Sequence, residues 1–189
     1  MPTIASLKTF NGTETKLNRL GLRPLWEELK EILTGFHLNI QERLHANSAV
    51  HTRHVLEHRF EMVTGWSRRR TGELYWSKHL TKNNSRVCLG VKIRIAGRHD
   101  LSPQDLLIME IVGLSQQLIR GSIDIAALVV PSAQFSVYLG NRAPNLVDAI
   151  RAVERTRATD LPLIILALEH DGPGRPLPKK RTRQGRAET

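Results

Sequence analysis

The stretch SIDIAALVVP, residues 122–131, is apolar at every position after Asp124. A strand with one solvated face alternates apolar and polar residues, so a continuous apolar run predicts a strand buried on both faces. A second such run, LPLIILALE at 161–169, follows the helical pattern LVDAIRAVERTR at 146–157. Two doubly buried strands separated by a helix predict a covered sheet with parallel or mixed pairing, and therefore an α/β fold.

Upstream of this pair, the pattern predicts two helices followed by a group of strands. RPLWEELKEIL at 23–33 predicts a helix, with Pro24 in its first turn, and 47–65 predicts another that Asn47 or Ser48 caps. Residues 66–97 predict two or three strands joined by a turn at KNN.

Four further segments complete the expected fold. Residues 1–22 are polar and predict a loosely structured segment, and FHLNIQER at 36–43 predicts a short strand. Ser102 followed by Pro103 predicts the start of a helix that ends at Gly121. Residues 172–189 are rich in Pro, Gly and Arg without apolar periodicity, which predicts a flexible basic tail. The fold expected is thus a central mixed sheet flanked by helices, with an N-terminal helical portion.

The charge balance points to a polyanionic partner. Lys and Arg number 28 against 18 Asp and Glu, a formal net charge of +10. Such an excess favours phosphate contacts and makes nucleic acid the leading candidate. No apolar run approaches the roughly 18 residues of a membrane span, and Cys88 is the single cysteine. We therefore expect a cytoplasmic, nucleoid-associated protein without membrane contact, disulfide or cysteine-based zinc site.

The segment at 121–145 resembles type II restriction endonucleases of the BamHI/BglII/BstYI kind. The matching features are Gly121, Ile123-Asp124, Ala126, an apolar strand closed by Pro131, Tyr138-Leu139, Arg142 and Asn145. The resemblance extends more weakly over roughly residues 22–171. It implies a PD-(D/E)XK nuclease fold as the DNA-binding domain at 1–171, and a homodimer that binds double-stranded DNA at a short palindromic site.

The resemblance also implies which residues contact DNA. The family's matching loop carries an Asp-Arg pair that reads base edges in the major groove, and Arg142 matches the arginine whereas Asn141 departs from the aspartate. The guanidinium fork of Arg142 suits guanine. We expect phosphate contacts from Arg98, from a clamp formed by Arg68, Arg69 and Arg70, and from Lys179, Lys180 and Arg181 in the tail.

The strand CLGVKIRIAG, residues 88–97, bears on catalysis. Alternation places Lys92 and Arg94 on one face and Val91, Ile93 and Ile95 on the other, which by itself is typical of a surface strand. The resemblance implies metal-binding acids at the two cation positions. Because cations repel a divalent metal, we expect Lys92 and Arg94 to contact phosphate, and the protein to bind DNA without cutting it and without a cofactor.

Two other functions remain open. An active Mg²⁺-dependent endonuclease would need displaced carboxylates, for which Glu73, Asp100 and Glu110 are the candidates, with Asp105 as a further acid on the same helix as Glu110. A non-catalytic subunit of a defence complex would bind DNA weakly on its own. Selection of bound duplexes with and without Mg²⁺ separates these possibilities.

Overall fold

A mixed β-sheet forms the centre of the described part of the molecule. The computed structural model describes residues 1–71, 73–82, 84–139 and 142–173. Six strands pair in the order β1-β6-β5-β4-β3-β2. Their bounds are β1 Thr3–Thr9, β2 Ser67–Thr71, β3 Glu73–Lys82, β4 Ser85–Ile93, β5 Ile125–Pro131 and β6 Leu163–Glu169. The three middle strands β4, β5 and β6 are parallel, and the remaining pairs are antiparallel. The predicted α/β class with a mixed sheet is confirmed.

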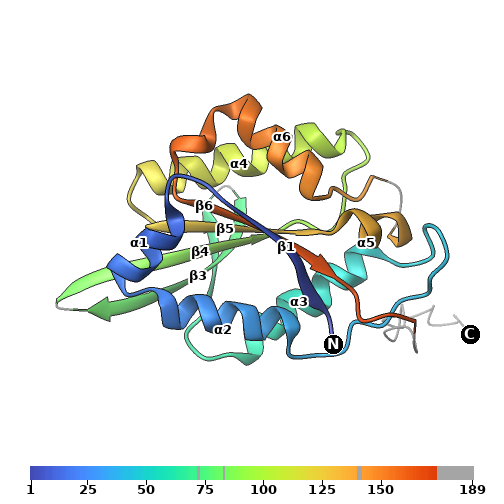
Figure 1. Cartoon of the computed structure of the whole chain (residues 1–189), viewed down its shortest axis with the longest axis horizontal. Coiled ribbons are helices and arrows are strands. Elements are labelled where there is room, and N and C mark those ends of the chain that lie inside the picture. Colours follow the sequence, from blue (N-terminus) through green and yellow to red (C-terminus); the bar gives the residue numbers. More distant parts are fainter. Residues whose placement is uncertain (72, 83, 140–141, 174–189) are drawn as a thin grey trace, which may run out of the picture.

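Helices cover both faces of the sheet. They are α1 Thr13–Leu20, α2 Arg23–Thr34, α3 Ala49–Met62, α4 Pro103–Ile119, α5 Ala133–Tyr138 and α6 Leu146–Thr156, with a 3₁₀ turn η1 at Ala158–Asp160. In Figure 1, α4 and α6 lie above the sheet, whereas α2 and α3 lie below it. The helix starts follow the predicted signals, because the Ser48 and Ser102 side chains accept the amide hydrogens of His51 and Asp105.

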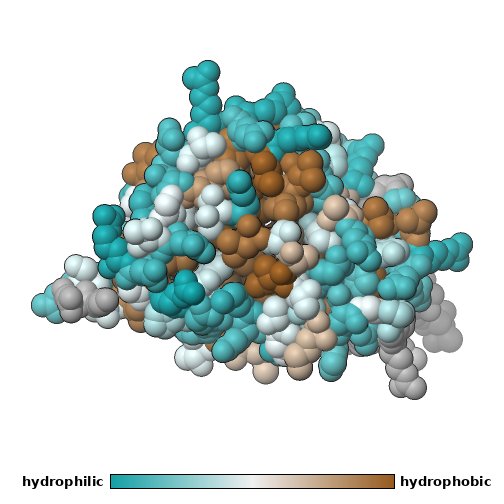
Figure 2. Space-filling view, in the orientation of Figure 1, coloured by the Kyte–Doolittle hydropathy of each residue, from teal (hydrophilic) through white to brown (hydrophobic). Residues whose placement is uncertain are grey.

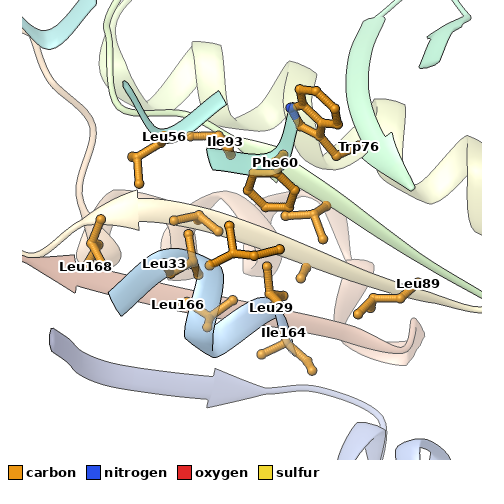
Figure 3. Packing of buried hydrophobic residues seen from close by; sticks show 14 of the residues in the cluster. Leu29, Leu33, Leu56, Phe60, Trp76, Leu89, Ile93, Ile164, Leu166 and Leu168 are labelled. Atoms are coloured by element: carbon orange, nitrogen blue, oxygen red, sulfur yellow. The ribbon is translucent and has the colours of Figure 1, made fainter. Parts of the chain in front are cut away.

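Each face of the sheet has its own core. Below the sheet, leucines of α2 and α3 pack against alternate residues of β4 and β6 around Phe60 (Figure 3). Phe60 stacks on Trp76 at 5.3 Å between ring centroids and meets Trp66 edge-on at 5.1 Å. Above it, α4 and α6 pack on the opposite side chains of β5 and β6. Both faces of β5 are therefore buried, as its continuous apolar sequence predicts.

The prediction of a loosely structured segment at residues 1–22 was wrong. Residues 1–22 contain β1 and α1, and β1 pairs antiparallel with β6, Thr3 lying opposite Glu169. The polar composition of β1 is explained by its place at the edge of the sheet, where most of its residues are exposed. The strand expected at 36–43 is also wrong, because this segment forms only an isolated bridge between Ile40 and Pro173.

The surface on the β1 side is mainly hydrophilic, with apolar side chains exposed in the middle of the view around β1 (Figure 2). None of the helices in the described ranges combines the length and hydrophobicity that crossing a bilayer requires.

Residues 174–189, with Lys179, Lys180 and Arg181, lie outside the described residues, so the prediction of a basic tail stays a prediction.

Candidate nucleic-acid interface

The two cations of β4 meet one buried carboxylate on α4. Lys92 lies on β4, and Arg94 follows the strand while its amide still donates to the Val129 carbonyl at 2.8 Å. Lys92 Nζ lies 2.6 Å from Oε2 of Glu110, and the Arg94 guanidinium pairs with Oε1 of the same residue. The Glu110 side chain is 1% exposed and the Lys92 side chain 6%. We call these three residues the buried triad.

The buried triad corrects the interpretation of β4 as a surface strand. Alternation is confirmed, because Lys92 and Arg94 both reach α4 whereas Val91 and Ile93 belong to the core on the other face. Both faces are nevertheless covered, and Glu110 forms an ion pair with each of the two cations. Arg94, whose side chain is 16% exposed, is the more accessible of the two to a phosphate.

The buried triad does not fit a divalent metal. A magnesium ion requires oxygen ligands that carry negative charge, whereas in the triad the one carboxylate is already paired with two cations. The candidate ligand Glu110 is therefore engaged by Lys92 and Arg94. In the described part of the chain, no three His, Cys, Asp or Glu side chains are grouped so that they could hold a metal ion.

Two loops meet beside the buried triad, at the edge where the parallel strands β4 and β5 end. The exposed Arg142 side chain donates to the His99 carbonyl, and its backbone has a left-handed φ of 72°. A Cβ added to Gly97 would lie 2.2 Å from the Arg142 carbonyl oxygen, so only glycine permits this approach. The loop after β4 thus positions the predicted base-reading arginine.

The same loop carries an exposed ion pair. Arg98 donates from Nε and Nη2 to the two carboxylate oxygens of Asp100 at 3.0 and 2.7 Å. These hydrogen bonds hold the pKa of Asp100 below its usual value. Asp105, at the start of α4, accepts a hydrogen bond from the Ser102 hydroxyl at 2.6 Å. Both carboxylates therefore have local partners in this structure.

Arg68 and Arg69 face opposite sides of β2. Because successive side chains of β2 alternate, Arg68 turns toward α3, where it pairs with the buried Glu57 at 3.3 Å and lies over the Trp76 ring. Arg69 turns to the opposite face, where its Nε donates to the Ser77 hydroxyl at 3.3 Å. Arg68 and Arg69 therefore do not point to one phosphate, and phosphate contact by each of these arginines stays a prediction.

Some predicted contacts cannot be placed. Asn141 lies outside the described residues, and so do the side chains of Arg70 and Glu73. The backbone register sets Glu73 at the start of β3, opposite Thr71. For these residues, the DNA contacts and the catalytic alternative stay predictions.

Sequence reasoning missed the pairing of Glu110 with the β4 cations. A signal was present, because Glu110 stands within LLIMEIVGL, and a carboxylate on an apolar helix face needs a buried cation. Which cations supply that partner depends on how α4 lies on the sheet. The chain matches no protein-family model and no curated protein sequence.

Proposed function

We propose that this chain is a double-stranded DNA-binding protein of nuclease-like architecture that binds a short site without metal-dependent cleavage. The observation that carries the proposal is the buried triad. It places two cations and one engaged carboxylate where the resemblance implies a metal held by acids. The basic charge balance of +10 supports a polyanionic partner.

The paired loops beside the triad supply the DNA-contacting groups in this proposal. The Arg142 side chain lies in an exposed loop and donates a hydrogen bond to the His99 carbonyl. Because this bond already restricts the side chain, less conformational entropy is lost when it binds DNA. Asn141 precedes it and is the second base-reading candidate. Arg98 and Arg94 lie on the segment that supports Arg142, so they are the candidates for adjacent phosphate contacts.

We propose further that the protein binds its site as a homodimer. Met109, Val112 and Ile119 are 42%, 41% and 77% exposed, and their spacing places them on one side of α4. Val147, on α6, is 47% exposed. A second copy that covers these side chains would remove apolar surface from water and present two sets of recognition loops, as a palindromic site requires.

Selection of bound duplexes from a random library, with and without Mg²⁺, tests the proposal. We expect enrichment of a short symmetric site and no cut ends in either arm. Metal-dependent scission at that site would overturn the proposal in favour of the endonuclease alternative with Glu73, Asp100 and Glu110. Failure to enrich any sequence would overturn it in favour of a subunit that depends on other proteins for DNA contact.

A further inference from the structure

A second group of basic side chains lies on the α4 side of β2, β3 and β4, far from the recognition loops. We propose that Arg69, His79 and Arg86 form a second phosphate-binding site that contacts the backbone of nucleic acid. We call these three residues the basic strip. The inference rests on the proposed function and extends it, because it adds a sequence-independent contact to the site-reading loops.

Strand register brings the basic strip together. His79 of β3 lies directly opposite Cys88 of β4, and Arg86 precedes Cys88 by two residues, so Arg86 is a diagonal neighbour of His79 on the same face. Arg69 of β2 lies opposite Tyr75, which makes Ser77 its diagonal neighbour. Three adjacent strands therefore place Arg69, His79 and Arg86 on one face of the sheet, with the buried Ser77 beside Arg69.

Hydrogen bonds orient the Arg69 guanidinium across the strip. Its Nε donates to Ser77 at 3.3 Å, and Nη2 lies 3.5 Å from Nε2 of His79. Burial, together with the positive charges of Arg86 and Arg69, lowers the pKa of His79. The lowered pKa favours the neutral imidazole, so the positive charge of the strip comes mainly from the two arginines, which favours an anion between them.

One carboxylate lies near the strip. Asp124, just before β5, accepts the amide hydrogen of Cys88 at 2.7 Å, while its own amide donates to the Cys88 carbonyl at 2.9 Å. Its charge opposes the effect of the two arginines on the pKa of His79, but burial and the arginines outweigh it. Both Arg69 and Arg86 are exposed.

The shape of the surface favours an extended polyanion. The β3–β4 hairpin projects past the helices that cover the rest of the sheet (Figure 1). Arg69 and Arg86 are exposed, and His79 between them is half-buried. Small anions are usually held in concave sites, whereas nucleic-acid backbone can lie across an open surface. Arg86 and Arg94 are eight positions apart along the chain, which corresponds to roughly 25 Å of strand. The strip is thus a site distinct from the recognition loops.

Salt dependence of DNA binding tests this site. The full chain and the double variant Arg69→Ala/Arg86→Ala are titrated with a fluorescent duplex of about 30 base pairs and random sequence, from about 50 to 200 mM NaCl. Loss of two phosphate contacts should reduce the slope of log K against log salt by about 2 in magnitude. The matched control Arg19→Ala/Arg151→Ala removes the same charge from exposed helix positions and should keep the parental slope.

Other outcomes separate the two proposals. An unchanged slope in the strip variant, with normal DNA binding by the parent, would overturn the second site and leave the proposed function standing. Absence of DNA binding by the parent would overturn the proposed function. The variant Arg69→Lys/Arg86→Lys keeps both charges and should retain the slope, and circular dichroism should show that all variants are folded.

Discussion

Glu110 is the residue of the buried triad whose replacement should affect stability most directly. It lies on the buried face of α4 and pairs with Lys92 and Arg94, so removal of its charge would break two ion pairs in the interior. We expect Glu110→Gln to lower the free energy of unfolding by about 3–5 kcal/mol, the usual cost of breaking a buried ion pair. Urea unfolding followed by tryptophan fluorescence measures the change.

Two comparisons control this prediction. Glu154→Gln removes a carboxylate from an exposed position of α6 and should change stability by less than about 0.5 kcal/mol. Replacement of all three members of the triad by methionine removes the desolvation cost together with the pairing, and should restore much of the loss. Equal stability of Glu110→Gln and Glu154→Gln would contradict the importance of the triad.

Cys88 lies toward the start of β4, away from Lys92, and its reactivity reports on the burial of that part of the strand. Burial and the nearby Asp124 charge raise the pKa of its thiol to about 11, and the side chain is 3% exposed. At pH 8 the thiolate is therefore scarce, and reaction with a disulfide reagent should be at least about 100-fold slower than in urea. Raising the pH toward 10 should speed the native reaction. Equal rates in the native and unfolded states would show that β4 is open there.

Arg142 is the residue on which sequence recognition depends in our proposal. If its guanidinium reads a guanine, Arg142→Ala should cost about 1–3 kcal/mol on the selected site and relax the preference at one position. The control Arg19→Ala removes the same charge from α1. Equal weakening on all sequences would assign Arg142 to phosphate contact instead.

At the scale of elements, the contact between the loop after β4 and the loop that carries Arg142 connects strand geometry to recognition. We expect Gly97→Ala to push the Arg142 backbone away and to reduce affinity for the selected site by about 10-fold or more, because a 2.2 Å contact with a carbonyl oxygen must be relieved. Competition binding against an unrelated duplex measures the loss of preference.

Gly90→Ala is the matched control for the loop contact. A Cβ there would lie 2.8 Å from side-chain atoms of Ile123 within the sheet core, so this variant should lose stability and keep its DNA preference. A reversed outcome, with recognition lost by Gly90→Ala and kept by Gly97→Ala, would remove the loop contact from the mechanism.

Local signals predicted most elements. The caps Ser48 and Ser102, the stripe of α2 and the continuous apolar runs of β5 and β6 depend only on neighbours in the chain, and the structure confirms them. β1 was missed because an exposed edge strand lacks an apolar pattern. Its partner β6 lies at the other end of the chain, beyond the reach of any local signal.

At the scale of the whole molecule, the exposed apolar side of α4 predicts self-association. We expect the parent to sediment as a dimer, and Val112→Asp/Ile119→Asp to sediment as a monomer with reduced affinity for the palindromic site, because a charge in an apolar interface is costly to desolvate. Analytical ultracentrifugation measures the mass. The control Val50→Asp changes a residue of α3 that is 51% exposed and should leave the dimer intact.

The sequence by itself determined the α/β class, the helix starts, the buried strands and the common face of Lys92 and Arg94, because periodicity and capping act over a few residues. Only the tertiary structure decided what those side chains meet. Glu110 reaches the β4 cations because α4 crosses back over the sheet, and alternation along β2 sends Arg68 to Glu57 and Arg69 to His79. A buried charge is stabilised by whichever partner the packing brings within reach, and that choice is made by the fold as a whole.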